Sequence, residues 1–180
     1  MPVSTEKHIL VALVVDRPGV MSRVSSLFRR RGFNIEKIAV GAAETPHLSR
    51  MTIQVLGTQA RVEQVRKQLE KLVDVVKVAD LYDDSVVARE LALVRVKATS
   101  ERRSEIIQIT NVFRASIVDV SCDSLAIEIT GDEEKIDSFL GLLRGYNIKE
   151  IARTGVIALT RGGASPLVVH RGPRTKKGKE

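Results

Sequence analysis

The stretch HILVALVVDRPGVMSRVSSLFRRRGFNIE, residues 8–36, decides the fold of this chain. Its first part, Ile9 to Val15, is the near-continuous apolar run expected of a central strand. After Gly19 the apolar residues recur at helical spacing, and Gly32 is a stop signal for that helix. The stretch therefore predicts a strand, an amphipathic helix and, from Asn34, the start of a second strand.

Three consecutive arginines, Arg29 to Arg31, fall in the last turn of this predicted helix. Positive charge at that end suits the helix dipole. We interpret these arginines as helix termination rather than as a phosphate site.

Hydrophobic periodicity extends the pattern to βαββαβ, and the same order recurs after an acidic linker. We therefore predict an α+β protein of two tandem units, residues 1–82 and 83–160, followed by a tail at 161–180. The predicted remainder of the first unit comprises strands at 34–42 and 49–55, a helix from 58 and a strand at 73–81. The predicted second unit comprises a strand at 91–98, a helix from 101, strands at 116–121 and 125–130, a helix from 132 and a closing strand at 148–160.

Composition and charge exclude several classes of protein. With 180 residues and 43% hydrophobic residues, the chain can form packed cores, and no apolar run approaches the ~20 residues of a membrane span. We expect a cytoplasmic protein without a membrane segment. The single cysteine, Cys122, can form no internal disulfide, and we expect it to be a small buried strand residue that binds no metal.

The net charge of +7 is concentrated at the end of the chain. Residues 161–180 carry six Lys or Arg and one Glu, whereas residues 1–160 are nearly balanced, with 23 basic and 21 acidic groups. This basic tail, rich in Gly and Lys, is predicted to be disordered. The distribution is not that of a nucleic-acid-binding groove.

A candidate binding site for a small amino acid lies at the turn Asp16-Arg17-Pro18-Gly19. Pro18 fixes its own φ and Gly19 permits close backbone approach, so the first helix amides are free for a carboxylate. Asp16 can accept from an ammonium group, and the Asn34 amide can donate or accept. Val20 and Ile35 are candidate apolar contacts. Asp before Pro-Gly is also a common turn and helix-start signal, so both interpretations stay open.

Other functions find less support in the sequence. The three histidines (His8, His47 and His170) occur in unrelated contexts, and no catalytic or metal-binding motif accompanies them. An RNA recognition motif shares the βαββαβ order, but Ile9 to Val15 and Ser49 to Val55 contain no aromatic residue on which bases could stack. We therefore expect no catalytic site and no nucleic-acid binding.

Several ordered motifs carry a family resemblance that covers roughly residues 6–163. The chain resembles the regulatory (small) subunit of acetolactate synthase, also called acetohydroxyacid synthase. The motifs are LVVDRPGVMSRV at 13–24, RGFNI at 31–35, LSRMTI at 48–53, QLEKLVDVVKV at 68–78, ARELALVRV at 88–96 and ARTGVIALTRG at 152–162.

The resemblance implies an N-terminal ACT domain and a C-terminal ferredoxin-like domain, each an antiparallel sheet with helices on one face. It implies a homodimer through the ACT domains, with a valine site between them, and leucine or isoleucine as further effectors. The catalytic partner would use thiamine diphosphate, Mg²⁺ and FAD to make 2-acetolactate or 2-aceto-2-hydroxybutanoate in branched-chain amino acid synthesis. This chain would bind no cofactor and would activate that partner.

By motif, the effector residues would be Asp16, Gly19 and Asn34, although many family members have Asn where this chain has Asp16. The alternative is a free-standing ACT sensor that acts on another enzyme.

Overall fold

The computed structural model describes residues 6–82, 85–162 and 167. The elements of the first unit are β1 (Glu6–Val15), α1 (Val20–Arg30), β2 (Ile35–Ala42), β3 (Leu48–Gly57), α2 (Gln59–Leu69) and β4 (Val75–Asp80). Those that follow are β5 (Val86–Lys97), α3 (Arg103–Val112), β6 (Ser116–Val120), β7 (Ser124–Gly131), α4 (Glu133–Leu143), a short 3₁₀ helix (Arg144–Tyr146), β8 (Ile148–Arg153) and β9 (Ile157–Thr160).

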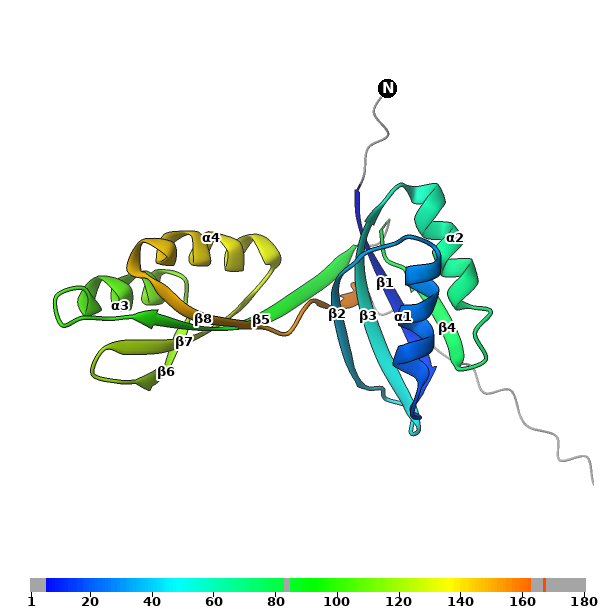
Figure 1. Cartoon of the computed structure of the whole chain (residues 1–180), viewed down its shortest axis with the longest axis horizontal. Helices are drawn as coiled ribbons and strands as arrows, with labels where there is room; N and C mark the ends of the chain where they lie inside the picture. Colours follow the sequence, from blue (N-terminus) through cyan, green and yellow to red (C-terminus); the bar gives the residue numbers. More distant parts are fainter. Residues whose placement is uncertain (1–5, 83–84, 163–166, 168–180) are drawn as a thin grey trace, which may run out of the picture.

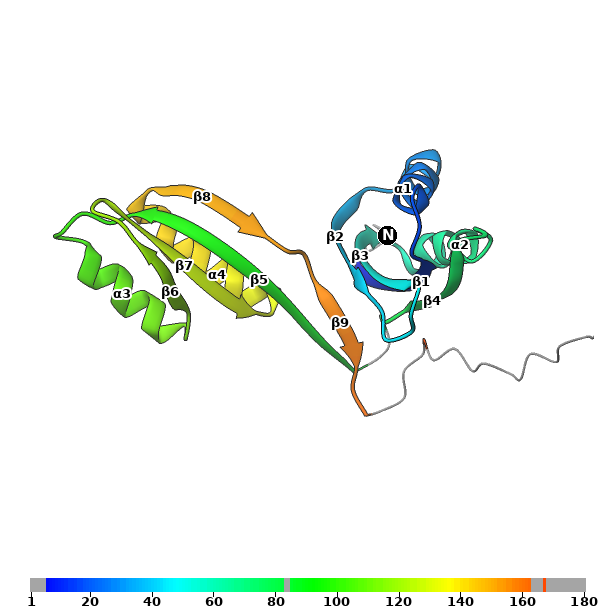
Figure 2. The ribbon, with the colours of Figure 1, turned by 90° about the horizontal axis from the view of Figure 1, so that it is seen from below.

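The two units lie end to end and share one architecture (Figures 1 and 2). The first sheet has the strand order β2-β3-β1-β4, with α1 and α2 on one face. The second has the order β6-β7-β5-β8, with α3 and α4 on one face. Neighbouring strands pair antiparallel throughout. The predicted α+β fold of two tandem ferredoxin-like units is confirmed.

Strand β1 is apolar along its length because both of its faces are buried. Leu10, Ala12 and Val14 belong to the core beneath α1 and α2. Val11 and Leu13 point to the opposite face and belong to a separate core. Two buried faces explain the continuous apolar run that identified this strand in the sequence.

The cover on that second face is a two-stranded ribbon that sequence periodicity did not predict. The closing strand expected at 148–160 is two strands, because the chain breaks after β8 and Gly155 adopts a positive φ of 78°. β5 begins at Val86 rather than at Leu91, and its first four residues pair with β9. This ribbon of β5 and β9 supplies Ala158 to the core on the helix-free face of the first sheet.

Part of the predicted disordered tail also packs against the first unit. The amide of Arg161 donates to the carbonyl of Ser85 at 2.7 Å, which extends the ribbon by one pair. Leu167 is only 1% exposed and lies in the core with Val11 and Leu13. The prediction of a disordered tail is therefore wrong for these two positions, because Arg161 continues the pairing of β5 with β9 and Leu167 packs on an apolar face of the first sheet. Residues 163–166 and 168–180 lie outside the described part of the chain.

The cysteine prediction was also wrong. β6 ends at Val120, and Cys122 is exposed in the turn that leads to β7. Cys122 lies between the two strands of this hairpin, where no neighbouring element covers its side chain.

Gly155 lies in the link between β8 and β9, close to the backbone of β2 in the first unit. A Cβ atom placed on Gly155 would lie 3.1 Å from the carbonyl oxygen of Ile38, and the φ of 78° already disfavours any side chain. We expect Gly155→Ala to lower the free energy of unfolding by about 2 kcal/mol, from backbone strain plus this contact. Denaturant unfolding followed by circular dichroism measures it, since the chain contains no tryptophan.

The matched control is Gly32→Ala. Gly32 also has a positive φ, of 65°, but a Cβ atom placed on it would have no neighbour within 4 Å. Strain alone should cost about 1 kcal/mol there. Equal losses for the two variants would show that the contact with Ile38 contributes nothing.

Candidate functional site

The turn between β1 and α1 has the form that the sequence predicts. The amide of Asp16 donates to the carbonyl of His47 at 2.9 Å, so the turn is fixed to the β2–β3 hairpin. Gly19 is the N-cap of α1 and adopts a left-handed φ of 88°, which an L-residue with a side chain rarely adopts. Within the described residues, no side chain caps α1. The first amides of α1 are therefore not capped by a side chain and can meet an anion.

The buried carboxylate of Asp74 stabilises this turn through two ion pairs. Asp74 is nearly inaccessible to solvent and forms ion pairs with both Arg17 and Arg23, one on each side of Gly19. Burial alone would raise the pKa of Asp74, but hydrogen bonds from Arg23 and Arg17 outweigh it and hold the pKa below its usual range. Asp74 therefore stays ionised and ties the first turn of α1 to the loop before β4. Sequence analysis missed this residue, whose only signal is a carboxylate between two valines.

A single chain does not bring Asp16 and Asn34 together. His8 on β1 and Ile35 on β2 both pair with Val55, so Asn34 lies level with the beginning of β1. Asp16 follows the last residue of β1, at the other end of the sheet. Seven residues of extended strand separate these levels by about 23 Å.

The burial of the predicted site residues differs from one to another. Asn34 is exposed, and its amide nitrogen donates to Glu36 at 2.9 Å. Val20 is buried in the core beneath α1, and Ile35 is partly buried against that core. Asp16 is exposed. The two ends of a possible site are thus present in each chain but apart from one another.

Charged side chains fasten the second unit to the first. The carboxylate of Glu90 is fully buried and accepts from Lys37 Nζ at 2.9 Å and from Arg153 Nε and Nη2 at 2.7 and 2.8 Å. Glu133, at the start of α4, binds Lys37 at 3.2 Å and Lys7 at 3.0 Å. Lys7 and Lys37 belong to the first sheet, so this ionic cluster spans the junction between the units.

The cluster makes the junction sensitive to acid. Burial acts to raise the pKa of Glu133, but hydrogen bonds from Lys7, Lys37 and Gln54 prevail and lower it from 4.5 to about 2. The unfolded chain therefore binds this proton more readily than the folded one. The contribution of Glu133 to stability is complete above about pH 4.5 and is lost as the pH falls towards about 2.

We expect this loss to amount to about 2 kcal/mol, after allowance for the partial exposure of Glu133. Denaturant unfolding at about pH 5 and about pH 2.5 should show a smaller pH dependence in Glu133→Gln than in the unaltered chain. Glu134→Gln is the control, since Glu134 lies in the same helical turn but takes no part in the cluster. An unchanged pH dependence in Glu133→Gln would contradict the assignment.

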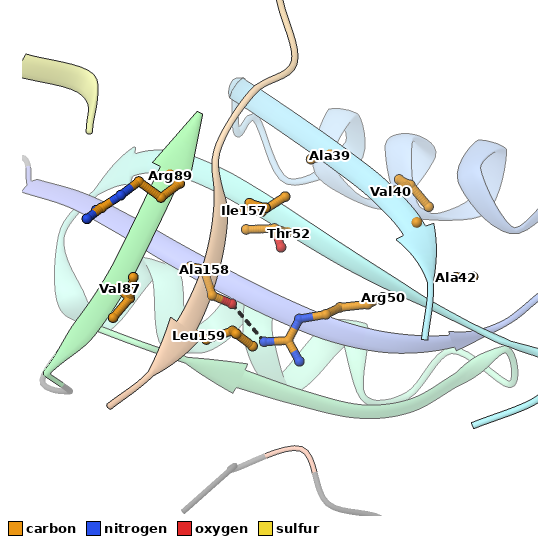
Figure 3. Close-up of a pocket in the computed structure, with 11 residues that line it drawn as sticks. Ala39, Val40, Ala42, Arg50, Thr52, Val87, Arg89, Ile157, Ala158 and Leu159 are labelled. Carbon is orange, nitrogen blue, oxygen red and sulfur yellow. Dashed lines mark hydrogen bonds between the residues drawn. The ribbon is translucent and has the colours of Figure 1, made fainter. Parts of the chain in front are cut away.

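An apolar groove lies where β2 and β3 face the ribbon (Figure 3). Its volume is about 370 Å³. Exposed Val40, Ile157 and Leu159 contribute to its wall, and Arg50 spans it by donating to the carbonyl of Ala158 at 2.8 Å. Four strands that are distant in the sequence, β2, β3, β5 and β9, build this groove, so no local sequence signal could have predicted it.

The four-stranded sheet β2-β3-β1-β4, with two helices on one face and a glycine at the first turn, defines the class of ACT domains. Residues 10–77 match the family model of the AHAS small subunit-like ACT domain, and residues 89–162 match that of the small subunit of acetolactate synthase. The chain belongs to the family of acetolactate synthase small subunits.

Relatives and a solved structure agree with this assignment. A probable acetolactate synthase small subunit of Methanothermobacter thermautotrophicus is 58% identical over 158 residues, which cover 87% of this chain and 94% of that protein. The acetolactate synthase small subunit of Mycolicibacterium smegmatis is 51% identical and covers 88% of this chain and 93% of its own length. The crystal structure of the small subunit from Thermotoga maritima superposes with a TM-score of 0.82 at 45% identity, covering 88% of this chain and 99% of that one.

In the described part of the chain, no helix is both long enough and apolar enough to cross a membrane.

Proposed function

We propose that this chain is the regulatory subunit of an acetolactate synthase, which activates the catalytic subunit and makes it subject to feedback inhibition by valine. Leucine and isoleucine are further candidate effectors. The observation that carries this proposal is the family membership, which extends over both units and most of the chain. The thiamine diphosphate, Mg²⁺ and FAD of the reaction would belong to the catalytic subunit.

The topology of the first sheet supports an effector site between two copies of this chain. β2 is an edge strand, and it runs in the same direction as β1 because both pair antiparallel with β3. Ala42 and Val14 both pair with Ser49, so the end of β2 lies beside the Gly19 turn. An open strand edge is a template for pairing with another chain.

Two copies that pair β2 antiparallel about a two-fold axis would satisfy both edges at once. The beginning of one copy's β2, which follows Asn34, would then lie opposite the end of the other copy's β2. That end adjoins the turn of Asp16 and Gly19. A homodimer of this kind unites the residues that a single chain holds apart.

At this seam, the interface between the paired β2 strands of the two copies, each part of an amino acid would meet a suitable group. The first amides of α1 and of Gly19 would donate to the carboxylate, where the helix dipole also favours negative charge. The Asp16 carboxylate would accept from the ammonium group, and the Asn34 side chain of the other copy would complete the polar contacts. Many family members carry Asn at the position of Asp16. The carboxylate of Asp16 adds a charge that attracts the ammonium group.

An effector at the seam would act by stabilising one arrangement of the two ACT domains. Inhibition requires that the catalytic subunit prefer a different arrangement, since a ligand shifts an equilibrium only by its differential affinity. Linkage then makes the coupling reciprocal. The catalytic subunit should change the affinity of this chain for valine by the same factor by which valine changes the affinity between the subunits.

The decisive experiment measures acetolactate formation by the catalytic subunit of the same organism. It is assayed alone, with this chain, and with this chain plus valine. Stimulation that valine reverses is the expected result. Stimulation without a response to any branched-chain amino acid would refute the effector part of the proposal and keep the subunit role. No stimulation, together with valine binding in calorimetry, would favour a free-standing sensor of another enzyme.

A further inference from the structure

The helices α1 and α2 lie on one face of the first sheet (Figure 2). Residues from α2 and from the end of α1 line a polar cavity. Its volume is about 490 Å³, within the usual range for small-molecule sites. Arginines and glutamines dominate its wall, and no acidic residue of the described chain contributes to it. The lining residues are Arg30, Arg31, Phe33, Arg61, Gln64, Val65 and Gln68.

The lining comes from two separate segments that the fold brings together. Arg61, Gln64, Val65 and Gln68 recur at helical spacing and therefore form one stripe of α2. Arg30 is the last residue of α1, Arg31 is its C-cap, and Phe33 follows the helix. The run of arginines at the end of α1 is a local motif, but tertiary structure adds Arg61 and the two glutamines of α2 to it.

The arginines of this cavity are not needed to end α1. Backbone amides already satisfy the last carbonyls of the helix, since Arg31 N donates to Leu27 O at 3.1 Å and Phe33 N donates to Phe28 O at 3.0 Å. Our interpretation of the arginines as helix termination accounts for their place in the sequence, but it does not explain what their guanidinium groups bind.

Three of the residues that line this cavity are arginines without a counter-charge. Across residues 6–82 and 85–162, the side chains of Arg30, Arg31 and Arg61 make no ion pair and donate no hydrogen bond. Arg66, which lies on α2 like Arg61, is different because Glu63 and Glu70 pair with it. Arg61 instead stacks over the ring of Phe33, with its central carbon 4.8 Å from the ring centroid. Stacking on a ring fixes a guanidinium plane and leaves its edge donors available.

We propose that this cavity is a binding site for a phosphate-bearing small anion. Arginine matches phosphate oxygens with paired donors, and three unpaired guanidinium groups offset the charge of more than one phosphate oxygen. Gln64 and Gln68 add neutral donors at the rim. The site goes beyond the regulation of acetolactate synthesis and does not depend on it, so a negative result here leaves the effector proposal intact.

Calorimetry with inorganic pyrophosphate, and separately with inorganic phosphate, tests the site on the full chain at constant ionic strength. We expect saturable binding of pyrophosphate at one site per chain, weakened at least tenfold in Arg31→Gln/Arg61→Gln, which is about 1.4 kcal/mol. Arg29→Gln is the matched control, because Arg29 adjoins Arg30 on α1 but does not line the cavity. That control should bind within about twofold of the unaltered chain.

A second measurement needs no variant. Modification of the unaltered chain by an arginine-specific dicarbonyl reagent, read by peptide mass spectrometry, should be slowed by pyrophosphate at Arg31 and Arg61 but not at Arg29. The proposal is overturned by the absence of saturable binding up to about 1 mM, by equal weakening in Arg29→Gln, or by unaltered binding in the double variant. Equal protection of all three arginines would likewise show only diffuse attraction between anion and surface.

Discussion

Two variants that each fail to bind valine should recover binding when they are combined in one dimer. Gly19→Ala forces the turn out of its left-handed conformation, and Asn34→Ala removes the amide at the other end of the sheet. Each variant alone should lose at least tenfold in valine affinity, because both seam sites of its homodimer are damaged in the same way. A dimer with one copy of each variant has one site that combines both alterations and one that is intact.

Random assortment makes half of the dimers mixed, so roughly a quarter of the original binding capacity should return. Co-refolding equal amounts of the two variants, followed by calorimetry with valine, measures the binding capacity that returns. The pair Gly19→Ala and Asp16→Ala is the control. Both alterations lie in the same turn, so every site of their mixed dimer is damaged and no capacity should return. Failure of the first pair to recover, with mixed dimers present, would disprove a site shared between two chains.

Local signals in the sequence predicted the elements of both units and the shape of the Gly19 turn. Each of these depends on residues close in the chain: the glycine with positive φ, the helical spacing after it and the arginines at the end of α1. The helix-cap residues Thr58 and Asp132 also do in the structure what their sequence positions suggest, since each accepts from the amide three residues later.

The contacts that join the units could not be predicted in this way. Glu90 and Lys37 are 53 positions apart, and Glu90 and Arg153 are 63 positions apart. Alternation along β5 places Glu90 on the inward face, but nothing local tells which cations meet it there. The ribbon was missed for a related reason. Its apolar residues fit a longer strand equally well, and only Gly155 marks the break.

The candidate site shows the same limit. The sequence motif correctly identifies a turn with an uncapped helix start, yet it suggested that Asp16 and Asn34 flank one pocket. Strand register separates them by about 23 Å along the strand direction within a chain. In the proposed homodimer their proximity would depend on a second copy, and no pattern within one chain specifies how two copies pair.

Removal of the buried carboxylate at the junction should have the largest effect on stability. Glu90→Ala removes the buried carboxylate that pairs with Arg153 and Lys37. Each cation keeps one other partner, Asp137 for Arg153 and Glu133 for Lys37. Loss of one partner from a buried charge cluster exposes the full cost of desolvating the others. We expect the free energy of unfolding to fall by about 3 kcal/mol.

Asp137→Ala is the control because Asp137 also pairs with Arg153, at 2.8 Å, but is more than half exposed. An exposed pair of this kind should contribute about 0.5 kcal/mol or less. Denaturant unfolding followed by circular dichroism compares the two variants. Equal, small losses would mean that water replaces the carboxylate of Glu90 at no cost, and the junction would then depend on the apolar packing of the ribbon. A large loss for Glu90→Ala alone would show that this carboxylate, through the two cations it binds, fixes the second unit to the first.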